Sequence, residues 1–213
     1  MTGIIHFETF LFAGILLNLT PGNDTIFILS KSIGQGRKAG IISAIGIGAG
    51  CIVHTMMAAF GLSLVIAKSI MLFNVIKIAG AAYLVYMGYK MIVEKNGLNT
   101  AAISSLSSSP GYFKIFRDGV ITNILNPKVA LFFIAFLPQF IDPAVKSPEI
   151  PFLILGFTFI LTGTAWCLLL ACFAAVIFKR LKNNKQSAIL INRICGWTLV
   201  ALGVKVAITN PEN

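Results

Sequence analysis

The sequence is poor in charged residues, and acidic ones are the scarcest. Seven Asp and Glu stand against 17 Lys and Arg, and charged residues make up 11% of the 213-residue chain. A soluble domain carries about 25%. The chain instead has 57% hydrophobic residues and a mean hydropathy of +0.88. So little charge cannot cover a surface in water, and the composition therefore excludes a soluble globular domain and indicates a lipid environment.

Cysteine and histidine are also few, which limits metal, thiol and nucleophilic chemistry. The four cysteines, Cys51, Cys167, Cys172 and Cys195, fall in apolar segments, form no C-x-x-C pair and have no metal-ligand spacing with histidine. We interpret them as packing residues. No Ser-His-Asp set, no pair of catalytic carboxylates and no metal motif can be recognised. The sequence therefore predicts neither an enzyme nor a protein with a bound cofactor or metal.

Apolar runs, by contrast, are long and numerous. Six occur at approximately residues 4–30, 41–67, 70–93, 119–141, 152–178 and 188–208, and a helix needs about 20 residues to cross a bilayer. The first run lacks the positive flank of a signal peptide, so we expect it to be retained. The sequence thus predicts an all-α polytopic membrane protein, with six transmembrane helices in a single domain over residues 1–213.

A polar, serine-rich stretch at about residues 97–114 separates the third run from the fourth. Its composition is that of a flexible linker in the cytoplasm. It divides the chain into a first repeat, about residues 1–96, and a second, about residues 115–213. Because three helices reverse the direction of entry, two similar halves would be inverted repeats, which is the plan of many secondary transporters.

Basic residues are unevenly shared between the two sets of loops. When the loops after the first, third and fifth runs lie on one side, that side collects 12 of the 17 Lys and Arg. The positive-inside rule then places these loops in the cytoplasm and both termini outside. Since the basic residues lie between hydrophobic runs, the formal charge of +10 does not indicate nucleic-acid binding.

Two of the apolar runs are interrupted by polar residues and proline. The first contains NLTPGND, which includes Asn18, Thr20, Pro21, Gly22, Asn23 and Asp24. The fourth contains TNILNPK, which includes Thr122, Asn123, Asn126, Pro127 and Lys128. Proline removes a backbone donor and clashes with the preceding turn, so we expect both helices to be broken there. Counted from the cytoplasmic ends, placed at Ser30 and Arg117, Pro21 lies about nine residues in and Pro127 about ten. Both are therefore about 15 Å deep, which is half of a hydrocarbon core of about 30 Å.

Broken backbone at the bilayer midplane is tolerated only where it is buried in protein or lines a wet cavity. Freed amides there attract anions and freed carbonyls attract cations. Asp24 could hold an ammonium group, and Lys128 with the helix-end amides could hold a carboxylate, which would suit a zwitterion. Two alternatives stay open: the prolines only kink the helices, or Asp24 and Lys128 form a structural ion pair.

Two further features of the second run have competing interpretations. His54 is a candidate proton relay, or else a residue that hydrogen-bonds one helix to another. The glycines of GIGIGAG, Gly46, Gly48 and Gly50, are more typical of close helix packing than of a nucleotide-binding loop, because no strand precedes them.

At these motifs the chain resembles the LysE/RhtB superfamily of amino-acid exporters. The segment LTPGNDTIFILSKSIGQGRKAGIISAIGIGAG, followed by VHTMMAAFGLS, is similar to the opening of the family, and GVITNILNPKVALFFIAFLPQFI is similar to its second signature. The motif positions that carry over are Pro21, Gly22, Asp24, Gly36, Arg37, Gly40, Asn126, Pro127 and Lys128. Asn23 stands where the family often has a second proline. The motif is nearer to the homoserine/threonine branch than to the lysine-exporting one.

The resemblance implies secondary-active export of amino acids or close derivatives, small neutral ones being favoured, across the inner membrane of a bacterium. It also implies that protons are the coupling ion. Our hypothesis is alternating access around the midplane site, where Asp24, protonated from outside, would release the substrate ammonium. His54 is the second candidate for proton coupling, and the glycine-rich second run is compatible with a homodimer.

The same six-helix plan is compatible with other functions. An inorganic-cation or other small-solute transporter is the alternative, but only Asp24 and His54 could coordinate a cation, whereas cation sites collect several oxygens. A thiol-redox membrane protein would need cysteines in the broken helices, which have none. In a non-transporting scaffold the midplane charges would be purely structural. The sequence names neither the substrate nor the side chains that line its pocket.

Overall fold

The computed structural model describes residues 3–63, 70–93, 111–142, 144–183 and 185–208. This part of the chain is helical apart from turns, short connections and one isolated β-bridge between Ile4 and Ile141. The all-α prediction is therefore confirmed for the described residues.

The elements follow one another as a series of helices, several of them in consecutive pieces. In chain order they are α1 (Phe7–Leu19), α2 (Asn23–Gln35), α3 (Arg37–Met57), η1 (Ala58–Leu62), α5 (Ile70–Val93), α7 (Tyr112–Ile124), α8 (Pro127–Leu131), η2 (Phe132–Phe136), η3 (Leu137–Phe140), α9 (Glu149–Asn183) and α10 (Lys185–Ile208). Helix α5 coincides with the third apolar run. Helix α2 continues past the first apolar run, and α7 begins before the fourth one. The last three residues of the predicted linker are therefore helical. Residues 97–110 of that linker lie outside the described residues.

Two of the helices are long and apolar enough to cross a membrane by themselves. They cover Arg37–Leu62 and Glu149–Ala174. Two further candidates are bent pairs, α1 with α2 at 48° and α7 with Pro127–Phe140 at 46°. The described part of the chain thus holds two to four candidate spans by length and composition, and the chain is a multi-pass membrane protein.

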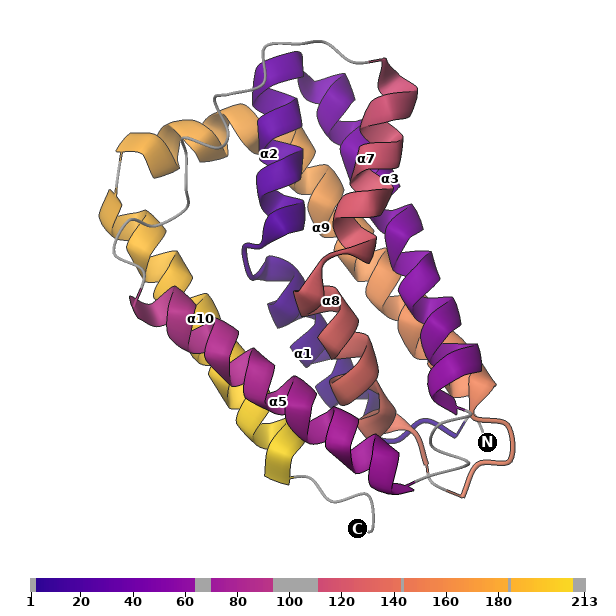
Figure 1. Ribbon diagram of the computed structural model, residues 1–213. Helices are drawn as coiled ribbons and strands as arrows, with labels where there is room; N and C mark the ends of the chain where they lie inside the picture. The colour runs from indigo at the N-terminus through magenta and orange to yellow at the C-terminus, as the bar shows by residue number, and fades with distance from the viewer. Residues whose placement is uncertain (1–2, 64–69, 94–110, 143, 184, 209–213) are drawn as a thin grey trace.

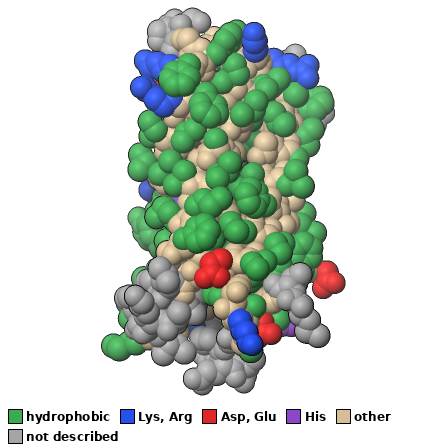
Figure 2. Space-filling view, turned by 90° about the vertical axis from the view of Figure 1, so that its right-hand side faces the viewer, with side chains coloured by type: hydrophobic (Ala, Val, Ile, Leu, Met, Phe, Trp, Pro, Cys, Tyr) green, Lys and Arg blue, Asp and Glu red, His purple; other side chains and the backbone are tan. Residues whose placement is uncertain are grey.

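The two ends of the helical bundle differ in charge. Helix α1 begins and α10 ends at the lower end, whereas α2 ends and α7 begins at the upper end (Figure 1). On the face drawn in Figure 2, basic side chains gather mainly at the upper end, acidic ones with a further basic one lie toward the lower end, and hydrophobic side chains cover the surface between them. A continuous apolar side surface between polar ends is what a lipid-embedded bundle requires.

Aromatic side chains fill the lower half of the bundle. Phe10, Phe132, Phe133, Phe136, Phe140 and Phe159 are all buried. The rings of Phe132 and Phe159 stack with centroids 4.6 Å apart, and Phe10 meets Phe140 edge-on at 5.4 Å. Because α1, η2, η3 and α9 each supply rings to this core, the four elements are held together in the lower half of the bundle.

Helices α5 and α10 form a pair through small residues. A Cβ atom built on Gly88 would lie 2.5 Å from the carbonyl oxygen of Gly196, and one built on Gly196 would lie 2.6 Å from that of Gly88. The two backbones therefore touch, as small residues allow in membrane helices. The pair leans away from α2 toward the upper end of the bundle (Figure 1).

The glycines of the second apolar run also mark close helix contacts, which confirms the packing interpretation. Cβ atoms built on Gly46 and Gly50 of α3 would meet the carbonyl oxygens of Phe116 and Val120 on α7 at 2.4 and 2.7 Å. Gly48 faces α9 instead, with Thr164 Oγ1 at 2.8 Å from its built Cβ.

Substitution of Gly50 tests this contact. In Gly50→Ala the new methyl group meets backbone atoms that cannot move aside, and such overpacking costs about 1–3 kcal/mol. We expect a lower thermal midpoint in detergent, by about 2–4 °C per kcal/mol for a chain of this size. Gly61→Ala is the matched control, because nothing lies within 4 Å of its built Cβ. Equal midpoints for the two variants would contradict the proposed contact.

Candidate functional site

The first interruption lies between α1 and α2. Regular helix ends at Leu19 and resumes at Asn23, so Thr20, Pro21 and Gly22 form the connection. Pro21 has no N–H, so it cannot continue the series of backbone hydrogen bonds of α1. The hydroxyl of Thr20 donates to the carbonyl of Leu16 at 2.8 Å, which ties the connection back to the last turn of α1.

The second interruption lies between α7 and α8. Helix α7 ends at Ile124, and α8 begins with Pro127 at its first position, where a missing N–H has no consequence. Asn126 is the N-cap, and its Oδ1 accepts a hydrogen bond of 3.1 Å from the backbone N–H of Lys128. Helices α2 and α7 each have 13 residues, about 20 Å, so the two interruptions lie equally far along the upper halves of their bent pairs.

Lys128 joins the two interruptions. Its ammonium donates to the carbonyl oxygens of Thr20 at 2.8 Å and Leu17 at 3.1 Å, and the residue is 6% exposed. The last carbonyls of a helix lack intrahelical partners and carry the negative end of its dipole. Lys128 therefore satisfies the C-terminus of α1 from the other half of the chain, and this contact explains how a cation is tolerated at this depth.

Asp24 lies on the other side of the first interruption, in the first turn of α2. A helix N-terminus favours a negative charge there. Its Oδ2 accepts a hydrogen bond of 2.9 Å from Nδ2 of Asn123, whereas its buried Oδ1 has no hydrogen-bond partner. Asp24 and Lys128, both in the described part, do not pair with each other: each has a partner of its own. The alternative of a structural ion pair between them is therefore not what the structure has.

His54 reaches the same region from α3. Its Nε2 lies 3.1 Å from the backbone oxygen of Asn123, and its ring stacks on Phe133 with centroids 5.8 Å apart. Neither a hydrogen bond nor an ion pair joins His54 to Asp24, both of which are described residues. Asn123 lies between them, since its backbone oxygen faces the imidazole and its amide faces the carboxylate.

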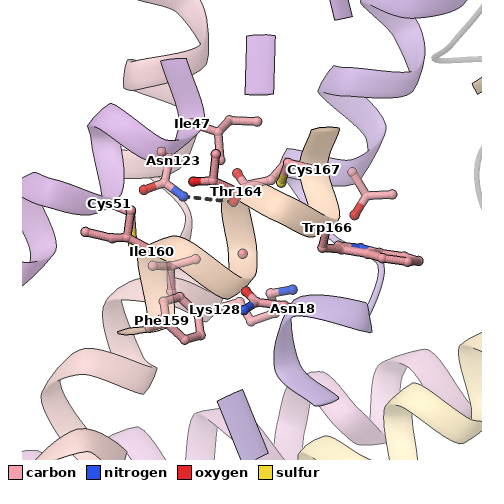
Figure 3. Close-up of a pocket in the computed structure, with 15 residues that line it drawn as sticks. Asn18, Ile47, Cys51, Asn123, Lys128, Phe159, Ile160, Thr164, Trp166 and Cys167 are labelled. Carbon is pink, nitrogen blue, oxygen red and sulfur yellow. Dashed lines mark hydrogen bonds between the residues drawn. The ribbon is translucent and has the colours of Figure 1, made fainter. Parts of the chain in front are cut away.

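A small chamber lies beside Asp24 and Asn123; it is the more enclosed of two cavities at the interruptions and is called the closed chamber below. It has a volume of about 40 Å³, and a buried water needs about 10–15 Å³ by the same measure, so a few waters fit. Its other lining residues are Asn18, Thr25, Ile47, Gly48, Cys51, Lys128, Val129, Phe159, Ile160, Gly163, Thr164, Trp166 and Cys167. Figure 3 shows these side chains around the chamber, with a dashed line from the Asn123 amide to the Asp24 carboxylate.

A larger, partly open cavity lies on the other side of the interruptions, against α5. Its volume is about 430 Å³, within the range of about 300–1,000 Å³ of small-molecule sites. It is lined by Gly22, Asn23, Ile26, Tyr83, Tyr86, Met87, Lys90, Met91, Asn126, Pro127 and Lys128. Lys128 lines both spaces, so the two cavities lie on either side of one cation.

Four buried polar atoms around these cavities have no hydrogen-bond partner. Two are acceptors, Oδ1 of Asp24 and Oδ1 of Asn123, and both residues line the closed chamber. Two are donors, Nε1 of Trp166 in the closed chamber and Nδ2 of Asn126 in the open cavity. Unpartnered buried polar atoms are costly, and their gathering at the helix interruptions suits a place where a polar ligand or water binds.

The residues predicted for the site therefore divide between the two cavities. Asn18, Asp24, Asn123 and Lys128 line the closed chamber, and Gly22, Asn23, Asn126, Pro127 and Lys128 line the open cavity. Thr20 and Pro21 form the first connection, and His54 lies behind Asn123. Asn18 also donates to the hydroxyl of Thr162 on α9 at 3.3 Å.

Sequence reasoning missed the walls that α5, α3 and α9 contribute. Tyr83, Tyr86 and Lys90 carried no signal, because α5 is apolar around most of its circumference. The polar pair around Gly163, in the stretch Thr162–Thr164, could have indicated the α9 wall. Two cysteines that we interpreted only as packing residues, Cys51 and Cys167, are buried and also line the chamber. Within the described residues, no three His, Cys, Asp or Glu side chains are grouped so as to hold a metal ion.

Comparison with known proteins gives a consistent result along almost the whole chain. Residues 15–210 match the LysE type translocator family. The uncharacterised membrane protein YrhP of Bacillus subtilis (strain 168) is 34% identical over 200 residues, which cover 91% of this chain and 94% of that protein. Leucine efflux proteins of Klebsiella pneumoniae subsp. pneumoniae and Enterobacter sp. (strain 638) are 29% and 30% identical over 209 residues, 96% of each chain. No solved structure matches the chain significantly.

Proposed function

The chain belongs to the LysE type translocator family, and from this premise we propose that it exports a neutral amino acid, or a close derivative, from the cytoplasm. Membership makes it a membrane transporter rather than an enzyme. Leucine efflux proteins align with it over 96% of its length, which supports neutral aliphatic amino acids as the substrate class.

The observation that carries this proposal is the environment of Asp24. One of its carboxylate oxygens is buried and unpartnered beside a chamber whose walls are partly apolar, with Ile47, Val129, Phe159 and Ile160 among the lining residues. An ammonium group supplies the donor that this oxygen lacks. The apolar walls suit an aliphatic side chain, and the chamber would have to widen from its present volume to accept one.

We extend the proposal to six membrane spans in two inverted repeats. Helices α5 and α10 have 24 residues each, enough to add two spans to the four candidates. Helices α1 and α7, which precede the interruption in each half, have 13 residues each and run into it from opposite ends, which supports related, inverted halves. Basic residues at the upper end favour a cytoplasmic location for that end, with both termini outside the inner membrane.

Alternating access gives a role to the unequal ends of the bundle. The aromatic core fills the lower half of the bundle, whereas the open cavity reaches the interruptions from the side of α5, so this conformation would be the inward-facing one. In the opposite conformation the halves would have rocked around the site. Asp24 would then take up a proton from outside, release the ammonium, and return the proton inward, with His54 coupled to it through Asn123.

The experiment that tests the proposed function is efflux from bacteria that lack their own neutral amino-acid exporters. Cells loaded with a leucine-containing dipeptide hydrolyse it internally, and leucine appearing in the medium is measured with and without expression of the chain. We expect faster efflux with expression. An expressed, membrane-inserted protein that accelerates the efflux of no neutral amino acid would contradict the proposal, and a response to divalent cations instead would favour the inorganic-cation alternative.

A further inference from the structure

We propose that the open cavity between α5 and the two interruptions is the subsite for the substrate carboxylate, and that Asn126 is its specificity-determining donor. The inference rests on the proposed function and deepens it, since it names the group that holds the second charged end of the amino acid. The two charged groups of an α-amino acid are carried by one carbon atom, so the substrate lies at Lys128, which lines both spaces, with its ammonium toward Asp24 and its carboxylate toward the open cavity.

The side-chain amide of Asn126 is available to a ligand only as a hydrogen-bond donor. Its Oδ1 already accepts the N–H of Lys128, which fixes which end of the amide is oxygen. Nδ2 is therefore the free end, and it is buried without a hydrogen-bond partner in a residue that is 2% exposed and lines the open cavity. An NH₂ group can only donate, so the ligand that it lacks is an acceptor.

The N-terminus of α2 adds positive potential to the same cavity. Helix α2 starts after Gly22, which has no side chain to cap it, and both Gly22 and Asn23 line the cavity. The first N–H groups of a helix have no intrahelical acceptor and carry the positive end of its dipole, which together attract anions. The carboxylate of Asp24, on the same turn, lines the other cavity.

Two lysines complete the electrostatics. Lys128 uses two hydrogen bonds on the carbonyls of α1, and an ammonium has three donors, so one remains for a ligand. Lys90 of α5 also lines the cavity and is exposed, so it adds a cation on the opposite wall. Among the residues that the structure describes, no acidic one lines this cavity, in contrast to the closed chamber with Asp24.

The other unpartnered donor, Nε1 of Trp166, is the rival for the carboxylate. It lines the closed chamber. That chamber holds only a few waters. The helix N-terminus beside it, that of α2, presents the acidic side chain of Asp24 to the chamber. The open cavity is about ten times larger by volume, so it is the one that accepts a ligand group without rearrangement.

Asn126→Asp is the informative substitution. Aspartate keeps the oxygen that caps α8, because Asp and Asn are equally good N-caps, but replaces the free NH₂ with a negatively charged oxygen. Asn126→Ser keeps a capping oxygen and removes the donor amide without adding charge. Trp166→Phe removes the rival donor while retaining an aromatic ring.

The measurement is transport into everted membrane vesicles, whose outer face is the cytoplasmic one. Initial rates are recorded against labelled leucine concentration, and unlabelled leucinamide, whose carboxylate is blocked, is used as a competing ligand. For Asn126→Asp we expect the KM for leucine to rise at least about tenfold, because one hydrogen bond to a charged group is lost. The inhibition constant of leucinamide should be unchanged or fall. Asn126→Ser should raise the KM by less, and Trp166→Phe should leave the ratio of the two constants as in the wild type.

The outcomes separate this inference from the proposed function. If the wild type transports leucine but Asn126→Asp weakens leucine and leucinamide equally, or changes only the maximal rate, Asn126 is structural and the inference is wrong. A changed ratio in Trp166→Phe but not in Asn126→Asp overturns it in favour of the closed chamber. If the wild type transports no neutral amino acid, the proposed function fails, and the inference fails with it.

Discussion

Asp24→Asn is expected to abolish proton-driven accumulation of substrate. The variant keeps the shape of the side chain but removes the negative charge on the unpartnered Oδ1 and the group that would carry the proton. The charge pair at stake is the Asp24 carboxylate with the ammonium group of the substrate. Truncating one partner of such a buried pair costs about 2 kcal/mol or more, which corresponds to a loss of about 30-fold in affinity for the substrate. Both the binding of the ammonium and the coupling to protons depend on the same carboxylate, so this is the largest effect that we expect from a single change.

The measurement for Asp24→Asn is accumulation of labelled amino acid in everted vesicles with an imposed proton gradient. Asp118→Asn is the matched control, because Asp118 has a 30% exposed side chain and pairs with its neighbour Arg117 at 3.5 Å at the basic end. An exposed pair of this kind contributes about 0–1 kcal/mol, so the control should accumulate substrate like the wild type. If Asp24→Asn retained full gradient-driven accumulation, the coupling role of Asp24 would be wrong.

The second large effect is expected for Lys128→Met, on stability as well as transport. Methionine is similar in length, but it leaves the carbonyl oxygen of Thr20 without its hydrogen-bond donor. The carbonyl oxygen of Leu17 loses the ammonium of Lys128 but keeps the hydrogen bond from the backbone N–H of Thr20. An unsatisfied buried acceptor costs about 1–3 kcal/mol, and a hydrogen bond from a charged group is at the upper end of the range. We expect a loss of about 1–3 kcal/mol and a thermal midpoint lower by about 2–4 °C per kcal/mol.

Lys114→Met provides the comparison for Lys128→Met, since Lys114 is exposed near the start of α7. It removes the same charge without removing a buried hydrogen bond, and its midpoint should equal that of the wild type. An unchanged midpoint in Lys128→Met would show that the contact with α1 does not hold the two interruptions together. If Lys128→Met weakens leucine and leucinamide transport equally, the third ammonium donor has no part in holding the carboxylate.

Much of the site follows from local chemistry that a single sequence contains. A proline without an N–H cannot continue a helix, so Pro21 and Pro127 mark where regular helix ends whatever surrounds them. Asp24 and Lys128 stand out because charges are rare in apolar runs. Glycines spaced four apart, as Gly46 and Gly50, indicate one face of a helix that another backbone can approach.

The partners of these residues could not be predicted in the same way. Asn123 and Asp24 are 99 positions apart, and two charges in a sequence suggest an ion pair more readily than two separate contacts. Lys128 binds backbone carbonyls, which every residue carries and no sequence pattern distinguishes. The wall supplied by Tyr83 and Tyr86 depends on the rotation of α5, and a helix that is apolar on nearly all sides does not reveal which side faces the protein.

Hydropathy also did not predict the residues at which the helices begin and end. Counting from the apolar runs placed the cytoplasmic ends at Ser30 and Arg117, whereas α2 continues to Gln35 and α7 begins at Tyr112. Polar and basic residues extend a membrane helix into the headgroup region without interrupting its hydrogen bonds. Both ends move outward by five residues, so the two interruptions keep equal depths even though each lies further from its helix end than expected.

The central claim is that this chain moves a neutral amino acid through the region of Asp24. The most direct measurement is counterflow with purified protein in proteoliposomes, loaded with a high concentration of unlabelled leucine and diluted into a trace of labelled leucine. We expect transient accumulation of label inside, which is suppressed in Asp24→Asn and retained in Asp118→Asn. Label that enters no faster than into protein-free liposomes, or equally in all three proteins, would contradict it.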